Sequence, residues 1–69
     1  MKPSVYQMIE LVGTSEKSWE EAAKNAVEKA ADQYKDMRIA EVVSLDLKVL
    51  NNQVVAYRAR VKVSFKVED

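Results

Sequence analysis

The sequence predicts an α+β fold with the element order β-α-β-β, in which antiparallel strands pack on a single helix. An alanine-rich stripe at helical spacing in residues 19–34 and strict apolar alternation in residues 55–67 carry this prediction. The length of 69 residues is enough for a single domain, residues 1–69, with a small core. We therefore expect one sheet with one face covered by the helix.

The first strand and the helix are predicted on either side of a short turn. Residues 4–12, SVYQMIELV, are rich in β-branched and aromatic side chains and predict a strand that ends near Gly13. Ser18 opens the sequence SWEE, in which Ser18 and Glu21 can each satisfy a free backbone N–H at a helix start. The helix is expected to run to about residue 35. Its apolar stripe consists of Trp19, Ala22, Ala23, Ala26, Val27, Ala30, Ala31 and Tyr34.

The second half of the chain predicts two strands joined by a tight turn. Residues 55–67 have apolar side chains at the odd positions, which is typical of a strand with one buried face. Asn51 and Asn52 suit the turn, because asparagine tolerates positive φ. Residues 38–50 predict the preceding strand, and its apolar residues of one parity are Ile39, Val43, Leu45, Leu47 and Val49.

Composition restricts the possible functions. The chain has 11 basic and 11 acidic residues, so no net charge attracts the whole protein to nucleic acid or to an anionic membrane. It has no cysteine or histidine, the side chains most readily poised for catalysis near neutral pH, so we do not expect an enzyme. Without disulfides or such metal ligands, a chain this small is expected to gain stability by self-association. The sequence shows neither a signal peptide nor a membrane span, and we expect a cytoplasmic protein.

Two features suggest ligand binding but have plainer explanations. Trp19 could stack on a flat ring, although its place on the helix stripe favours covering the sheet edge or a neighbouring subunit. A basic row on the last strand could contact phosphates, but acidic residues of the other strands can neutralise it, which favours a solvated or salt-bridged face. The row is Arg58, Arg60, Lys62 and Lys66, and the acidic residues are Glu10, Glu41 and Asp46.

The chain resembles the dodecin family over essentially its full length. The resemblance lies in YQMIELVGTSEKSWEEAAKNAVEKA, in AEV at residues 40–42 and in the terminal VKVSFKVED. It implies a strongly curved antiparallel sheet packed on the helix, and a hollow homododecamer. It also implies non-catalytic binding and storage of a flavin, FMN or riboflavin, in pockets between subunits.

The chain departs from the flavin-binding members at the ligand site. Those members carry an acidic residue, a tryptophan that clamps the flavin ring and an aromatic residue where this chain has Arg38, Ile39 and Ala40. Arg58 stands where they have a glutamine that hydrogen-bonds the flavin. Flavin binding of the usual type is therefore not favoured at Ile39 and Arg58. Lys66 corresponds to a basic residue near the tail on which some members bind coenzyme A.

The chain is more similar to a subgroup without that tryptophan, the calcium dodecins, with which it shares GTS, SWE and an aspartate at Asp46. This likeness implies a bound cation. One aspartate cannot supply the oxygen ligands that calcium prefers, so Glu41, backbone carbonyls or symmetry-related copies would contribute. Equally open is that Asp46 is a cross-strand partner of Arg58 or Arg60.

The sequence thus predicts a homo-oligomeric protein that binds or stores a small ligand without catalysis. Its cofactor-binding candidates are Ile39, Arg58 and Lys66, and its metal-ligand candidates are Asp46 and Glu41. The alternative is a cage that binds calcium or another cation, or one that is purely structural. A nucleic-acid-binding module is less favoured, and we expect neither nucleic acid nor membrane as a partner.

Overall fold

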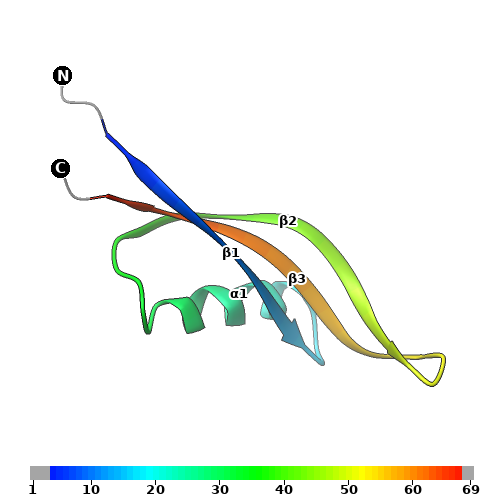
Figure 1. Ribbon diagram of the computed structural model, residues 1–69. Helices are drawn as coiled ribbons and strands as arrows, with labels where there is room; N and C mark the ends of the chain where they lie inside the picture. Colours follow the sequence, from blue (N-terminus) through cyan, green and yellow to red (C-terminus); the bar gives the residue numbers. More distant parts are fainter. Residues whose placement is uncertain (1–3, 68–69) are drawn as a thin grey trace.

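A computed structural model of the chain describes residues 4–67 and has the predicted element order (Figure 1). The elements are β1 (Tyr6–Ser15), α1 (Trp19–Ala30), β2 (Met37–Leu50) and β3 (Gln53–Lys66). β3 is the central strand and pairs antiparallel with both β1 and β2. In Figure 1, α1 lies along one side of a bent sheet, and the β2–β3 hairpin extends beyond it. The α+β prediction is confirmed.

The core lies between β3 and the alanine stripe of α1. Val61 and Val63 of β3 are fully buried and form the core cluster with Ala26 of α1. The helix approaches β1 closely at Gly13. A Cβ atom at Gly13 would overlap the carbonyl oxygen of Ala22 and would lie 2.9 Å from the Cβ of Ala26. Gly13 is therefore required for this close contact, and the small side chains of α1 make it possible.

The helix begins as predicted and ends earlier. Ser18 is the N-cap, and its side chain accepts a hydrogen bond from the backbone N–H of Glu21 at 3.0 Å. The last helical residue is Ala30, although the apolar stripe predicts a helix to about residue 35. The Tyr34 N–H still donates to the Ala30 carbonyl at 2.9 Å, in a closing turn. The Tyr34 ring packs on Phe65, with 5.1 Å between ring centroids, which draws the chain toward β3.

The β2–β3 hairpin has the predicted turn but an irregular register. Asn51 and Asn52 have φ angles of 53° and 61°, which confirms the prediction of a tight turn at positive φ. The expectation that Ile39 and Leu45 share a face is wrong. Ile39 pairs with Ser64, whereas Leu45 pairs with Ala59, and the register shifts between Val42 and Ser44. The extra residue of this bulge reverses which side chains face α1.

The protomer leaves much apolar surface exposed. Its radius of gyration is 14.4 Å, compared with about 11 Å for a compact domain of 69 residues. Its accessible surface is 5495 Å², compared with about 4,400 Å² for a compact monomer of 7.8 kDa. The exposed side chains include the large apolar residues Val12, Ile39 and Leu50, which are 51%, 67% and 58% exposed. Exposed apolar patches on a small chain are typical of surfaces that bind other proteins. Within residues 4–67, no helix is long and apolar enough to cross a membrane.

Candidate functional site

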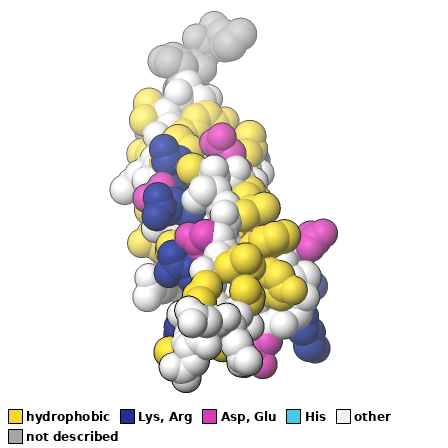
Figure 2. Space-filling view, turned by 90° about the vertical axis from the view of Figure 1, so that its right-hand side faces the viewer, with side chains coloured by type: hydrophobic (Ala, Val, Ile, Leu, Met, Phe, Trp, Pro, Cys, Tyr) yellow, Lys and Arg dark blue, Asp and Glu magenta, His cyan; other side chains and the backbone are white. Residues whose placement is uncertain are grey.

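All of the predicted site residues lie on the sheet face opposite α1, which we call the helix-free face. Arg58 and Lys66 have the parity of β3 that points away from the buried Val61 and Val63. The antiparallel register adds the others, because Ile39 faces Ser64, Glu41 faces Lys62 and Asp46 faces Arg58. In Figure 2, basic and acidic side chains alternate along one side of the molecule, beside a hydrophobic patch.

Asp46 and Arg58 form the strongest polar contact on this face. The Arg58 Nε donates to Asp46 Oδ1 at 2.7 Å, and its Nη2 donates to Asp46 Oδ2 at 2.9 Å. This hydrogen bonding lowers the pKa of Asp46; desolvation opposes it, and the positive charges of Arg58 and then Arg60 lower the pKa further. The same contact raises the pKa of Arg58. The cross-strand pairing left open by the sequence is thus present, with Arg58 as the partner.

Trp19 holds the same aspartate from the other side of the sheet. Its indole Nε1 donates to the backbone carbonyl of Asp46 at 3.1 Å. Its ring meets Tyr57 edge to face, with 5.2 Å between centroids and 75° between planes. The interpretation of Trp19 as a cover for the sheet edge is therefore confirmed. All the oxygen atoms of Asp46 accept hydrogen bonds, from Arg58 or from Trp19.

Ile39 lies in an exposed apolar strip at the opposite end of the helix-free face. It shares a cross-strand row with Ser64 and Met8, and the next row pairs Tyr6 with Lys66. Ile39 is 67% exposed, Met8 55% and Tyr6 53%. The strip therefore offers apolar side chains next to the ammonium group of Lys66. Such a surface suits a molecule that has a flat apolar part and an anionic group.

The predicted cofactor residues do not all come together in one protomer. Arg58 and Ser64 are six positions apart on β3, which corresponds to about 20 Å of strand. Lys66 is two positions from Ser64, about 7 Å, and so lies near the row of Ile39. Ile39 and Lys66 can serve one ligand, and Arg58 belongs to a separate cluster with Asp46.

The predicted metal ligands are also separated. Glu41 faces Lys62, which faces Glu10 on its other side, so this row has its own charge balance. Its distance from the Asp46 row is four positions along β3, or about 13 Å. Within residues 4–67, no three acidic, histidine or cysteine side chains gather where they could hold a metal ion. A calcium ion prefers six or more oxygen ligands, so Asp46 and Glu41 of one protomer do not fit it.

Sequence reasoning did not assign Tyr6 and Met8 to the ligand site. Their place beside Ile39 depends on β3 lying between β1 and β2. The alternation of residues 55–67 is more regular than that of the other strands, but it is typical of any antiparallel strand with one buried face and does not indicate which strand is central.

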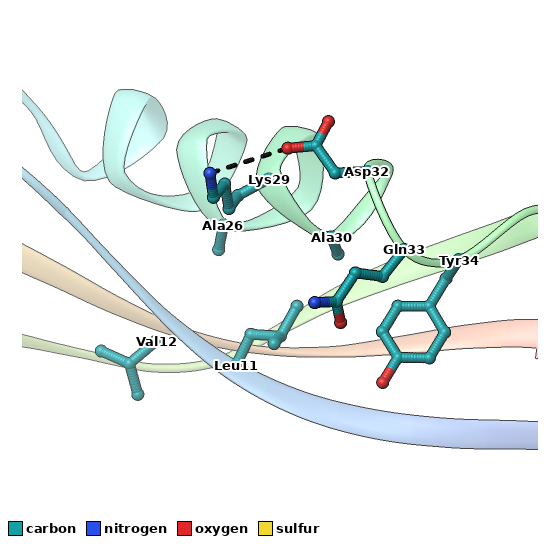
Figure 3. Close-up of a pocket in the computed structure, with 8 residues that line it drawn as sticks. All are labelled: Leu11, Val12, Ala26, Lys29, Ala30, Asp32, Gln33 and Tyr34. Carbon is teal, nitrogen blue, oxygen red and sulfur yellow. Dashed lines mark ion pairs between the residues drawn. The ribbon is translucent and has the colours of Figure 1, made fainter.

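Three hollows that are lined by described residues contain none of the predicted site residues. The hollow in Figure 3 has a volume of about 310 Å³ and lies between β1 and the end of α1, with an ion pair of 3.7 Å between Lys29 and Asp32 at its rim. In Figure 3, Gln33 and Tyr34 reach down beside Leu11. A second hollow, of about 320 Å³, is almost entirely apolar and is lined by Trp19, Glu20, Ala23, Val42 and Leu45. A third, of about 400 Å³, is lined by Thr14, Ser15, Glu16, Lys48, Val55 and Ala56.

Comparison with known proteins gives consistent matches over almost the whole chain. The family model described as Dodecin matches residues 5–68. The calcium dodecin of Mycobacterium tuberculosis is 44% identical over 64 residues, which cover 93% of this chain and 90% of that protein.

Solved structures give the same result. A crystal structure of the Mycobacterium tuberculosis protein, described as a calcium-chelating antigen with a novel calcium-binding site, has a TM-score of 0.84 at 43% identity, covering 94% of this chain and 93% of that one. The dodecin from Streptomyces coelicolor has a TM-score of 0.89 at 28% identity, covering 100% and 99% of the two chains.

Proposed function

Because this chain belongs to the dodecin family, we propose that it forms a hollow homododecamer that binds and stores a small molecule without transforming it. The ligand lies on the helix-free face at the apolar strip of Tyr6, Met8 and Ile39, and a neighbouring copy covers it. This ligand has a flat ring and an anionic group. A flavin such as FMN has this chemistry, although Ile39 offers less stacking surface than an aromatic ring.

The observation that carries the proposal is the exposure of Ile39, at 67%, beside two further exposed apolar side chains. Full burial of such a side chain stabilises a protein by about 1.5–3 kcal/mol, and a side chain that remains exposed to solvent does not contribute this stabilisation. Association of two copies through the strip recovers it. A flat ligand between the two strips adds further apolar contact, and Lys66 supplies a charge for the anionic group.

The assembly is tested by light scattering and native mass spectrometry. We expect a particle with the mass of a dodecamer at micromolar concentration, and a stable monomer or dimer would contradict the proposal. Native mass spectrometry of protein purified from its own host reports the retained ligand in the same measurement.

The ligand site is tested by quenching of FMN fluorescence. The unchanged chain is expected to bind FMN weakly and to quench it little. Ile39→Trp is expected to bind FMN about five- to 150-fold more tightly, because a stacked aromatic pair is worth about 0.5–1.5 kcal/mol and two facing copies supply two contacts, or about 1–3 kcal/mol. Val54→Trp is the matched control, since Val54 is also exposed but lies at the hairpin tip. Lys66→Gln is expected to weaken the binding of FMN more than the binding of riboflavin, because riboflavin has no phosphate. Equal quenching by the two tryptophan variants would count against this site.

A second candidate function is binding of a divalent cation. It is supported by the relative from Mycobacterium tuberculosis that is described as calcium-chelating. In this chain a cation site would have to combine carboxylates from several copies, because Glu41 and Asp46 of one protomer lie about 13 Å apart. A rise in melting temperature on adding calcium that is absent in Glu41→Gln would favour this function.

A further inference from the structure

The cluster around Asp46 disagrees with the calcium site that the relatives suggest. Calcium is held by six to eight oxygen atoms at about 2.3–2.6 Å, and carboxylate and carbonyl oxygens are its usual ligands. Both carboxylate oxygens of Asp46 already accept hydrogen bonds from Arg58, and its backbone carbonyl accepts one from Trp19. A cation at Asp46 has to displace these donors before it can bind.

We propose that Arg58 is a built-in cation that occupies Asp46, and that it determines the ionic selectivity of this end of the helix-free face by excluding calcium. The guanidinium group matches the carboxylate with two parallel hydrogen bonds, which a lysine cannot do. If calcium displaced it, the Arg58 charge would remain close to a divalent cation and would repel it.

The surroundings of the pair keep it in place. Tyr57, next to Arg58 in sequence, packs against Trp19 on the opposite face of the sheet. Trp19 in turn holds the Asp46 carbonyl, so the backbone of Asp46 is attached to the start of α1. The carboxylate and the guanidinium therefore face each other across a fixed register. This inference does not depend on the ligand proposed near Ile39, because the two clusters lie about 20 Å apart.

The test compares calcium binding by the unchanged chain with binding by Arg58→Gln, using isothermal titration and melting temperatures in calcium or in EDTA. We expect no Asp46-dependent calcium binding by the unchanged chain. Arg58→Gln is expected to gain Asp46-dependent calcium binding that is about five- to tenfold tighter than any calcium binding by the unchanged chain, and to melt at a higher temperature in calcium than in EDTA, because removing the competing cation frees the carboxylate. The double variant Asp46→Asn with Arg58→Gln should lose this gain.

Two further variants serve as controls. Arg60→Gln removes a positive charge from the same face and strand but leaves the Asp46–Arg58 contact, so we expect it to behave like the unchanged chain. Arg58→Lys keeps the charge with fewer hydrogen bonds, and its calcium affinity should lie between those of the unchanged chain and Arg58→Gln. The proposal is overturned if the unchanged chain binds calcium in an Asp46-dependent way. It is equally overturned if Arg58→Gln binds no more tightly than Arg60→Gln, or not at all. Quenching of FMN fluorescence should be the same in all these variants. A wrong proposal about calcium at Asp46 can therefore be distinguished from a wrong proposal about the ligand at Ile39.

Discussion

Replacing Gly13 with alanine tests the close contact between α1 and β1. Without a steric obstacle, this change within a strand should stabilise the fold, since glycine costs about 0.5–1 kcal/mol relative to alanine. The structure predicts the opposite, because the new Cβ would overlap the Ala22 carbonyl oxygen. Overpacking costs about 1–3 kcal/mol. A backbone carbonyl has no rotamer to change, so we take the upper value and expect a net loss of about 2 kcal/mol.

The assay is thermal unfolding followed by circular dichroism at one fixed protein concentration, because the melting temperature of an oligomer depends on concentration. For a domain of this size, about 2 kcal/mol corresponds to a decrease of about 8–16 °C. Thr14→Ala is the control, since Thr14 is exposed and adjacent, and should change the stability by less than about 0.5 kcal/mol.

A double variant separates the contact of the added Cβ with the Ala26 side chain from its contacts with the backbone atoms of Ala22 and Ala26. Ala26→Gly removes the side chain that would lie 2.9 Å away but leaves the Ala22 carbonyl in place. We therefore expect Ala26→Gly to give no rescue of Gly13→Ala, and to cost about a further 1 kcal/mol as a glycine within a helix. An unchanged or higher melting temperature for Gly13→Ala would refute the reasoning.

The remaining predictions concern the helix-free face and its supports. Asp46→Asn should lower the melting temperature at pH 7. The pKa of Asp46 is lowered in the folded state, so its ionised form stabilises the fold at pH values above its ordinary pKa of 3.8. The difference in melting temperature between Asp46→Asn and the unchanged chain should therefore narrow as the pH falls below 3.8, in a series of thermal melts. A constant difference down to pH 2 would contradict this. Trp19→Phe removes the donor to the Asp46 carbonyl and should cost about 0.5–1.5 kcal/mol in urea unfolding, whereas full stability would show that the 3.1 Å hydrogen bond contributes nothing. Ile39→Lys should reduce the particle size in light scattering, with Glu28→Lys on the polar side of α1 as the control, and an intact assembly would remove Ile39 from the interface.

Local sequence signals predicted the elements well. The Ser18–Glu21 cap, the Asn51–Asn52 turn and the regular alternation of β3 each depend on neighbours within a few residues, and each is present. The end of α1 was predicted too late, because the contact between Tyr34 and Phe65 is distant in sequence and no local pattern indicates it.

The candidate site depends on irregular register, which alternation cannot predict. Near the turn Val49 faces Val54, and an unbroken two-residue hairpin would continue with Asp46 opposite Tyr57. The register shift between Lys48 and Val49 instead brings Arg58 opposite Asp46. The sequence therefore predicted that Asp46 could pair with Arg58 or Arg60, but the choice between them is made by one extra residue in a strand.

The small core described above links folding to assembly. The largest fully buried side chains are only Val61 and Val63, and alanines make up most of the remaining core. A chain of this size with so little buried apolar volume has almost no stability of its own to lose. Folding and association are then one reaction, in which the concentration of chains, rather than temperature alone, sets the folded fraction. Dilution should unfold this protein as effectively as mild heating.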